Sequence, residues 1–143
     1  MSTAHDVQQP ARDGRPANTA ASLGMLGLLA VQFLLGMAVN LYITLPSTGF
    51  GMAEMMGGGP LVMVHMMLGI ILVVGALLAF ATALPCGKWA VVCAAIALLG
   101  IVVAGIGGLT FLMGGQSNGA SLLMAVGFLV AVGGYVAELV KVS

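Results

Sequence analysis

Charged side chains are scarce in this sequence, and their scarcity excludes most classes of soluble protein. Asp, Glu, Lys and Arg make up 6% of the 143 residues, against about 25% in ordinary soluble domains. The four basic residues balance the four acidic ones, so neither a basic face for nucleic acid nor an acidic face for cationic partners can form. We therefore expect no soluble catalytic domain and no nucleic-acid partner.

Cysteines and catalytic motifs are equally sparse. Cys86 and Cys93 are the two cysteines, and their spacing fits neither a zinc site nor a redox C-x-x-C pair. The sequence contains no H-E-x-x-H motif and no Walker loop, because the glycines at 57–59 are not followed by Lys and then Ser or Thr. These absences predict a protein that is not an enzyme and has no resident cofactor.

Uncharged apolar sequence is what the chain has in abundance. Hydrophobic residues make up 61% of it, and its mean hydropathy is +1.18. A helix of about 20 apolar residues crosses the ~30 Å hydrocarbon core of a bilayer, and four runs of that length are present. They predict an all-α membrane protein, a four-helix transmembrane bundle, with spans at about 22–45, 61–83, 89–113 and 120–140.

Turns and a tail delimit these spans. Pro60 fits the first turn of the second helix, and Ser117 or Asn118 is placed to cap the last one. Residues 1–20 hold two prolines, four charges and only isolated apolar residues, so they predict a disordered tail. Residues 21–143 then form one four-span transmembrane domain, whose first span is longer than the ~7 to 15 apolar residues of a signal peptide.

The positive charges predict the orientation of the bundle. Arg12 and Arg15 precede the first span, Lys88 lies between the second and third, and Lys141 follows the fourth. An even number of crossings separates these positions, so all four charges lie on one side, which the positive-inside rule makes cytoplasmic. Both termini are therefore predicted to be cytoplasmic, with the tail at 1–20 inside and the protein in the plasma membrane.

Small residues recur at helical spacing within the spans. Helices in lipid gain little from hydrophobicity against one another, so close approach through small residues has to hold them together. The alternative is that these glycines reflect the higher glycine content of membrane helices in general. The pattern favours a compact bundle with a small-residue face left over for association. The residues are Gly100, Ala104 and Gly108 in the third span, Gly127 and Ala131 in the fourth, and, in a weaker version, Gly24, Gly27 and Gly36 in the first.

Polar side chains inside the spans are pointers to function, because each needs a partner or a cavity. His65 is the one histidine embedded in apolar sequence, about four residues or ~6 Å below the outer boundary of its span. Asn40, Thr110 and Asn118 fall at a similar depth near the outer ends of the other spans. We predict a polar outer-leaflet cluster of these four residues, while Gln32 is a further polar residue deeper in the first span.

Methionines share this bias toward the outer side, where nine of the eleven fall. Thioether sulfur with imidazole suits Cu(I), and His with Met is also an axial pair for haem. At ~100° per residue, the methionines that flank His65 in sequence point away from it, so ligands would have to come from the loop above or from other helices. A structural, proton-linked or ligand-binding role for His65 is the alternative. The metal set would be His65, Met37, Met52, Met55, Met56 and Met113, holding haem b or copper.

Glu138 is the acidic residue nearest to a span. It stands one helical turn before Lys141, and such a pair contributes a few tenths of a kcal/mol. We expect a loose Glu138–Lys141 ion pair at the end of the fourth span. Because a proton-coupled exporter carries an acid well inside a span, transport by this chain alone is disfavoured.

Three short motifs support a resemblance to known sequences. Asn40-Leu41-Tyr42 leads to Pro46, His65 is followed by Leu68-Gly69, and Ser117-Asn118-Gly119-Ala120-Ser121 opens the last span. With these motifs the chain resembles small four-span hypothetical membrane proteins of actinobacterial type, over residues from about 22 to 140. The resemblance implies a helical bundle in the plasma membrane and carries no activity with it.

The leading hypothesis is a non-enzymatic multi-pass plasma-membrane protein that acts as an accessory or assembling subunit. Its expected partners are the lipid bilayer and either a second copy of the chain or another membrane protein. The alternative hypothesis is a haem- or copper-binding electron-transfer or metal-handling protein that uses His65. A third is a sensor in which His65 and Asn40 hydrogen-bond a small apolar ligand between helices.

Overall fold

Four long helices and one short 3₁₀ helix build the computed structural model, which describes residues 15–43, 59–113 and 117–142. No strand is present among these residues, and each long helix is long and apolar enough to cross a membrane. The prediction of an all-α, four-helix transmembrane bundle is confirmed. In chain order the elements are α1 (Arg15–Tyr42), α3 (Gly59–Ala83), η1 (Leu84–Cys86), α4 (Lys88–Met113) and α5 (Asn118–Val142).

The first helix begins earlier than its composition suggested. It starts at Arg15, not at Ser22, so residues 15–20, which were predicted to belong to the disordered tail, are helical. Pro16 lies in the first helical turn, where its missing N–H would be unpaired anyway. The helix also buries Asn18, at 1% exposure, so partners elsewhere in the bundle order this polar turn. The rest of the predicted tail, residues 1–14, lies outside the described residues.

Three other helix ends contain a proline, a glycine or a serine at a position where that residue type is typical of helix ends. Pro60 is the second residue of α3, as expected for its first turn. Gly87 ends the η1 turn with a φ of 99°, which glycine adopts without steric cost, and α4 begins directly after it. The hydroxyl of Ser117 accepts a hydrogen bond from the Ala120 amide at 3.3 Å, so Ser117 caps α5.

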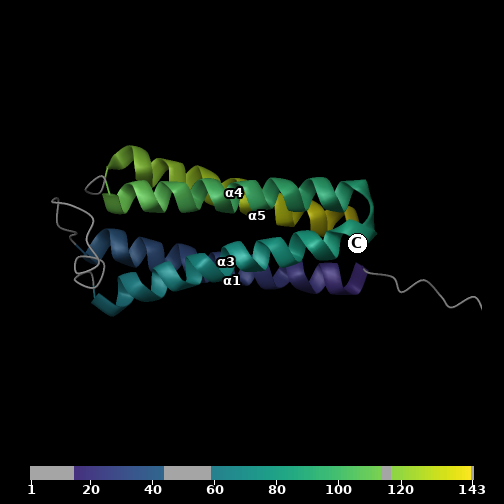
Figure 1. Cartoon of the computed structure of the whole chain (residues 1–143), viewed down its shortest axis with the longest axis horizontal. Coiled ribbons are helices and arrows are strands. Elements are labelled where there is room, and N and C mark those ends of the chain that lie inside the picture. Colours follow the sequence, from purple (N-terminus) through teal and green to yellow (C-terminus); the bar gives the residue numbers. More distant parts are fainter. Residues whose placement is uncertain (1–14, 44–58, 114–116, 143) are drawn as a thin grey trace, which may run out of the picture.

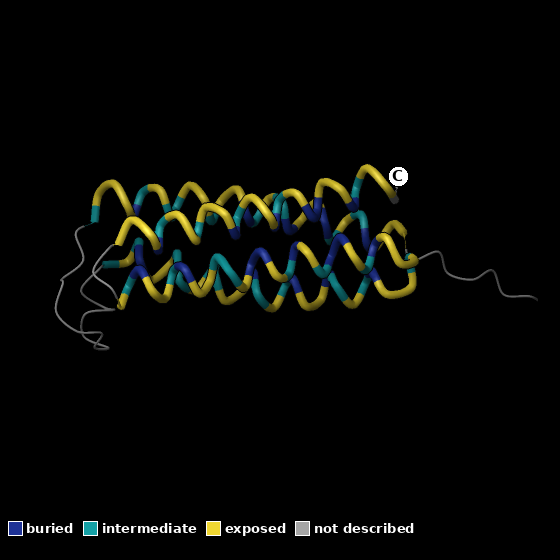
Figure 2. The backbone as a smooth tube through the Cα atoms, turned by 90° about the horizontal axis from the view of Figure 1, so that it is seen from above, coloured by how far each residue is buried: buried dark blue, intermediate teal, exposed yellow. Residues whose placement is uncertain are grey.

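Each helix turns a stripe of buried and half-buried residues, which repeats every seven positions, toward its neighbours. The steps alternate between three and four residues, and this average of ~3.5 is the repeat of helices that cross at about 20° in left-handed bundles. In Figure 2 the buried segments of the helices lie mainly toward the neighbouring helices, and the exposed segments lie on the outside. The stripes are 18, 22, 25, 29, 32, 36 and 39 in α1; 62, 65, 69, 72, 76, 79 and 83 in α3; 90, 93, 97, 100, 104, 107 and 111 in α4; and 120, 124, 127, 131, 134 and 138 in α5.

The bundle consists of two layers, α1 with α3 and α4 with α5 (Figure 1). The α4–α5 pair is the closer one: a Cβ at Gly100 would lie 2.5 Å from the Ala131 backbone nitrogen, and one at Gly127 would overlap the Ala104 backbone. The predicted small-residue contact of these helices is confirmed at those positions. At its far end Gly107, not Gly108, makes the close approach, because a Cβ at 107 would lie 2.7 Å from the Met124 nitrogen.

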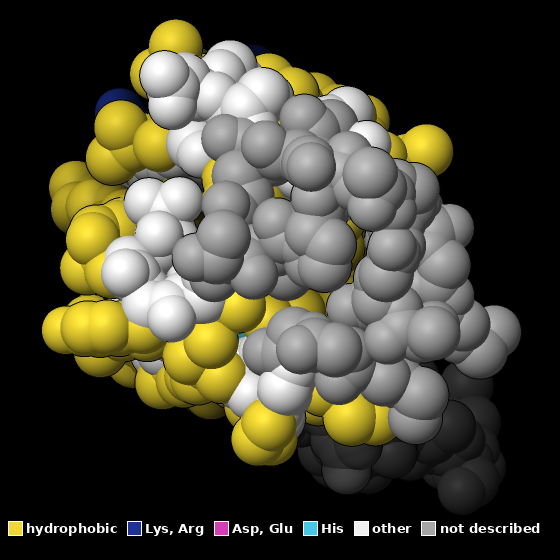
Figure 3. Space-filling view, turned by 90° about the vertical axis from the view of Figure 1, so that its left-hand side faces the viewer, with side chains coloured by type: hydrophobic (Ala, Val, Ile, Leu, Met, Phe, Trp, Pro, Cys, Tyr) yellow, Lys and Arg dark blue, Asp and Glu magenta, His cyan; other side chains and the backbone are white. Residues whose placement is uncertain are grey.

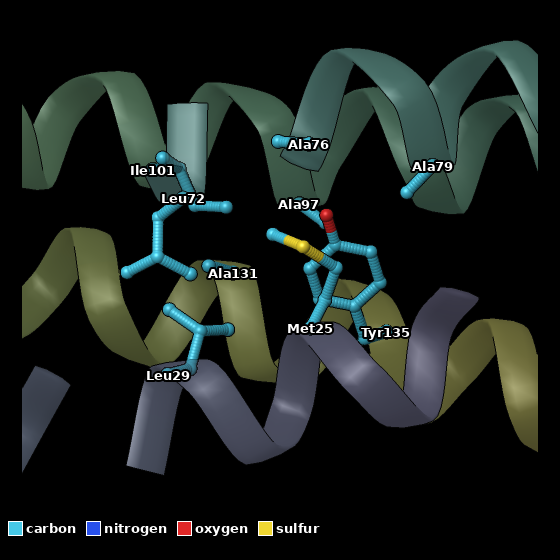
Figure 4. Packing of buried hydrophobic residues seen from close by; sticks show 9 residues of the cluster. All are labelled: Met25, Leu29, Leu72, Ala76, Ala79, Ala97, Ile101, Ala131 and Tyr135. Atoms are coloured by element: carbon cyan, nitrogen blue, oxygen red, sulfur yellow. The ribbon is translucent and has the colours of Figure 1, made fainter. Parts of the chain in front are cut away.

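The hydrophobic core lies between the two layers and is built around Tyr135. This side chain is fully buried, and Figure 4 shows it extending among Ala76, Ala79 and Ala97. Small residues on α3 and α4 thus leave the volume that one large residue on α5 fills. Met25 of α1 packs in the same cluster. The core therefore ties all four helices together.

The outer surface of the bundle is apolar. Large hydrophobic side chains such as Leu34, Leu78 and Leu129 are each about two-thirds exposed, at 67%, 65% and 66%. Seen from the end at which α1 ends and α3 begins, the described side chains around the rim are largely hydrophobic (Figure 3). Such a surface suits lipid, because soluble proteins rarely expose continuous apolar area of this extent.

Candidate functional site

Buried polar side chains lie near both ends of the bundle. We call the end at which α1 begins and α5 ends the terminal end, and the end at which α1 ends and α3 begins the opposite end (Figure 1). The terminal end holds a cluster of Asn18, Ser22, Thr82 and Glu138. The opposite end holds a pair, Gln32 and His65. We name these groups the terminal cluster and the Gln32–His65 pair.

The terminal cluster is closed by hydrogen bonds around one carboxyl group. Asn18 Nδ2 donates to Glu138 Oε1 at 3.0 Å, and Ser22 Oγ donates to Oε2 at 2.9 Å. All three residues are 1% exposed. The Thr82 hydroxyl lies 2.8 Å from the Ala79 carbonyl and 3.3 Å from Asn18 Oδ1, and its single hydrogen serves one acceptor at a time. The cluster therefore joins α1, α3 and α5.

Glu138 thus has different partners from the one expected. The sequence suggested a loose pair with Lys141, but both carboxyl oxygens accept hydrogen bonds from α1. Lys141 Nζ instead lies 5.5 Å from the centre of the Trp89 ring, a cation–π distance. A signal was present in the sequence, because Glu138 continues the seven-residue stripe of Gly127, Ala131 and Gly134 and so faces the interior.

The Gln32–His65 pair joins α1 to α3. Gln32 Nε2 donates to the His65 backbone carbonyl at 3.1 Å and lies 3.4 Å from His65 Nε2. Two glycines make room for the pair. A Cβ at Gly36 would lie 3.0 Å from His65 Cε1, and one at Gly69 would lie 3.4 Å from Gln32 Nε2. The imidazole therefore packs against the backbone of α1.

Three buried polar atoms have no hydrogen-bond partner among the described residues. They are Gln32 Oε1, His65 Nδ1 and the hydroxyl oxygen of Tyr135. A buried donor or acceptor left without a partner costs about 1–3 kcal/mol. Two of the three belong to the Gln32–His65 pair, so each residue of that pair has one buried polar atom without a described hydrogen-bond partner.

The predicted polar residues of the outer leaflet have different hydrogen-bond partners and exposures in the described structure. His65 bonds to Gln32, a deeper residue, and Asn40 is exposed because Val39 occupies the buried stripe beside it. The Thr110 hydroxyl lies within hydrogen-bond distance of two carbonyls of its own helix, at 3.0 Å and 2.9 Å. Asn118 is exposed at the start of α5. Among the described residues, no hydrogen bond links Asn40, Thr110 or Asn118 to His65.

The alternative metal ligands are described only in part. Met37 and Met113 are 41% and 62% exposed, while Met52, Met55 and Met56 lie outside the described residues. Within 15–43, 59–113 and 117–142, no group of three His, Cys, Asp or Glu side chains could hold a metal ion. Haem b or copper binding stays a prediction, which an absorption spectrum and elemental analysis of the purified protein would test.

The two cysteines are free thiols inside this architecture. Cys93 is buried on the α4 stripe, as its place in the span predicted. Cys86 is half-buried in the η1 turn, with its Sγ 3.4 Å from the Thr82 carbonyl oxygen. Both behave as small packing residues.

A second stripe of small residues runs along the outside of α1. Ala17, Ala20, Gly24 and Gly27 are all exposed, with the same alternating steps of three and four residues. A Cβ added at Gly24 or Gly27 would meet nothing within 4 Å. Gly100 of α4 and Gly127 of α5 each pack against the backbone of the other helix. In contrast, no described helix packs against the outward stripe of α1 at Gly24 and Gly27.

No family model matches this chain, and neither a curated protein nor a solved structure matches it. Its function therefore has to be inferred from the terminal cluster, the Gln32–His65 pair and the outward stripe of α1.

Proposed function

We propose that this chain is a non-enzymatic, multi-pass protein of the plasma membrane that works by associating with other membrane helices, as an accessory or assembling subunit. The outward stripe of α1 carries the proposal. Small residues let two helix backbones approach in lipid, where apolar side chains alone give no preference for protein over acyl chains. Gly24 and Gly27 offer such an approach and have open space around them.

The buried acid supports a non-enzymatic role. Both oxygens of Glu138 accept hydrogen bonds within the bundle, from Asn18 and Ser22, and the residue is 1% exposed. A general acid or base has to reach a substrate proton, directly or through one water. The carboxyl group of Glu138 is better suited to holding α1 against α5.

The orientation that we propose places the terminal end in the cytoplasm. Arg15 opens α1, Lys88 opens α4 and Lys141 stands near the end of α5, so the three described basic residues share one end of the bundle. The positive-inside rule assigns such an end to the cytoplasm. The outward stripe, which begins at Ala17, then lies in the cytoplasmic half of the membrane.

Association is tested by placing larger side chains at two glycine positions of the outward stripe. Replacing Gly24 and Gly27 together by Leu should weaken self-association in lipid vesicles at least about tenfold, or ~1.4 kcal/mol, as measured by energy transfer between labelled copies. The matched control is Gly105→Leu with Gly133→Leu, two positions on α4 and α5 where a Cβ also meets nothing within 4 Å. The control should associate like the wild type.

Two results would contradict the proposal. One is a wild-type chain that is monomeric in vesicles and that co-purifies with no other membrane protein. The other is equal weakening by the α1 pair of substitutions and by the control pair, since the effect would then come from surface bulk in general. If the wild type is monomeric but a membrane protein co-purifies and is lost with the α1 substitutions, the partner is that protein and not a second copy.

A further inference from the structure

The charged side chains that the structure describes all belong to the terminal end of the bundle. Arg15 begins α1, Lys88 begins α4, and Lys141 is the second-last residue of α5. Glu138, the single acidic residue among the described ones, is 1% exposed and accepts two hydrogen bonds inside the terminal cluster. The exposed charge of the described residues is therefore positive and confined to one end.

Trp89 lies next to two of these basic residues, where α4 begins and α5 ends. It follows Lys88 in the chain, and the Nζ atom of Lys141 lies 5.5 Å from the centre of its ring. All three side chains are exposed, Trp89 at 58%. The contact with the ring restricts a lysine side chain that would otherwise rotate freely, so a ligand has less conformational entropy of Lys141 to remove. We call Lys88, Trp89 and Lys141 the basic corner.

The basic corner lies at the depth of the lipid headgroups. α4 has 26 residues, or ~39 Å at ~1.5 Å per residue, whereas the hydrocarbon core of a bilayer is ~30 Å thick. The charged end of α4 therefore extends beyond the core, together with the end of α5, which runs beside α4 in the opposite direction (Figure 1). An exposed tryptophan at the end of a span is typical of this depth.

The basic corner holds positive charge at a place that favours negative charge. Lys88 lies in the first turn of α4, the end of a helix at which the dipole favours anions, and that turn contains no acidic side chain. The acidic residue nearest to Lys141 in the chain, Glu138, bonds to α1 instead. Each lysine close to an anionic membrane surface strengthens binding about fivefold, or ~1 kcal/mol.

We propose that the basic corner binds the headgroup of an anionic membrane lipid, such as phosphatidylglycerol, in preference to a zwitterionic one. The lysine ammonium groups donate to phosphate oxygens, and the exposed ring of Trp89 lies against the upper part of the acyl chains. A zwitterionic headgroup brings a cation with its phosphate, which the lysines repel. This site goes beyond the association function, because its residues belong to α4 and α5 and not to the outward stripe of α1.

Quenching of Trp89 fluorescence tests this preference, because Trp89 is the single tryptophan of the chain. The full chain is reconstituted in phosphatidylcholine vesicles that contain a minor fraction of lipid with brominated acyl chains, under either a phosphatidylglycerol or a phosphatidylcholine headgroup. Bromine quenches the ring on contact, so the ratio of the two quenching curves gives the relative affinity of the two lipids beside Trp89. We expect phosphatidylglycerol to be preferred at least about fivefold. Equal quenching by the two brominated lipids would overturn the proposal.

Charge variants identify the residues that make the site, and the ratio of the two lipids corrects for any change in the exposure of Trp89. Lys141→Gln should lower the preference about fivefold, and adding Lys88→Gln should make the two lipids equal. Lys141→Arg should keep the preference, since Arg also binds phosphate and stacks on aromatic rings. The matched control Arg15→Gln removes one positive charge from the same end but from α1, and it should keep most of the preference.

Three further results would contradict the proposal. An unchanged preference in the double lysine variant would place the lipid elsewhere. Equal losses in Arg15→Gln and Lys141→Gln would mean that the whole terminal end attracts anionic lipid and that the basic corner has no special part. Loss of the preference in inorganic phosphate, compared with chloride at the same ionic strength, would mean that the corner takes a soluble anion and not a lipid.

Discussion

The terminal cluster and the Gln32–His65 pair are built on the same stripe of α1, yet they differ in how completely their polar atoms are satisfied. In the terminal cluster Asn18 and Ser22 bond to both oxygens of Glu138. In the pair, Gln32 bonds through its nitrogen, and Oε1 of Gln32 and Nδ1 of His65 have no hydrogen-bond partner within the described parts of the chain. The same face of α1 thus takes part in a hydrogen-bonded network that pairs both Glu138 oxygens at one end, and in a pair with unpaired polar atoms at the other.

The difference indicates that the two groups contribute unequally to the stability of the bundle. A buried polar network whose members are all satisfied rigidifies the fold, while a partly satisfied one costs free energy until something completes it. The terminal cluster also adjoins the Lys141–Trp89 contact, which holds α5 to the start of α4. We infer that the terminal end holds the helices together more firmly than the opposite end does.

The largest expected effect comes from opening the terminal cluster. Glu138→Ala removes the acceptor of two interhelical hydrogen bonds, each worth about 0.6–1.7 kcal/mol in membrane proteins, so the free energy of unfolding should fall by about 2 kcal/mol. Unfolding by SDS in mixed micelles measures it, with the fluorescence of Trp89, the single tryptophan, as the signal.

Glu138→Gln is the control for this prediction. The amide keeps an oxygen for Asn18, and its NH₂ group can donate to the Ser22 hydroxyl, which also accepts. We expect most of the stability to be retained. A loss as large as that of Glu138→Ala would mean that the charge of Glu138, and not its hydrogen bonds, holds the terminal end together.

The helices could be predicted from the sequence because bilayer thickness fixes their length and apolar composition marks their extent. The start of α1 could not. Asn18 was assigned to the tail from its local composition. The residue to which it bonds, Glu138, stands 120 positions later. Local composition carries no information about such a partner.

The sequence singled out His65 as a polar residue inside a span, but it did not predict the partner of His65, Gln32. Depth alone grouped His65 with Asn40, Thr110 and Asn118, whereas the seven-residue stripe of α1 selects Gln32 and Gly36. Depth gives only one coordinate of a side chain, and the direction around the helix gives the other. The seven-residue stripe gives this direction around the helix. Applied to α5, it would also have predicted that Glu138 faces the interior of the bundle.

An intermediate effect is expected where a glycine supports the Gln32–His65 pair. Gly36→Ala puts a Cβ 3.0 Å from His65 Cε1, so the ring must move by a few tenths of an ångström and its contact with Gln32 weakens. Overpacking of this kind typically costs about 1 kcal/mol or more. Relative to Gly24→Ala, which gains the same helix propensity, we expect a loss of about 1 kcal/mol in the free energy of unfolding, measured in the same micelles.

Gly24→Ala, on the same helix, is the matched control. Its Cβ meets nothing within 4 Å, and the gain in helix propensity of up to about 1 kcal/mol should leave stability equal or higher. Ala17 and Ala20 in the same outward stripe indicate that alanine suits that face. Equal losses at positions 24 and 36 would mean that α1 needs glycine for its backbone, and the contact of Gly36 with His65 would not be the cause.

The smallest expected effect concerns Tyr135, which lies in the core cluster between the two polar groups. Its hydroxyl is buried without a partner, so Tyr135→Phe removes a group that is desolvated and unpaired in the folded bundle. The free energy of unfolding should stay equal or rise by up to about 1 kcal/mol in the SDS titration. The three alanines around the ring keep their contacts, because Phe preserves the ring itself. A loss of 1 kcal/mol or more would show that the hydroxyl has a partner such as a bound water.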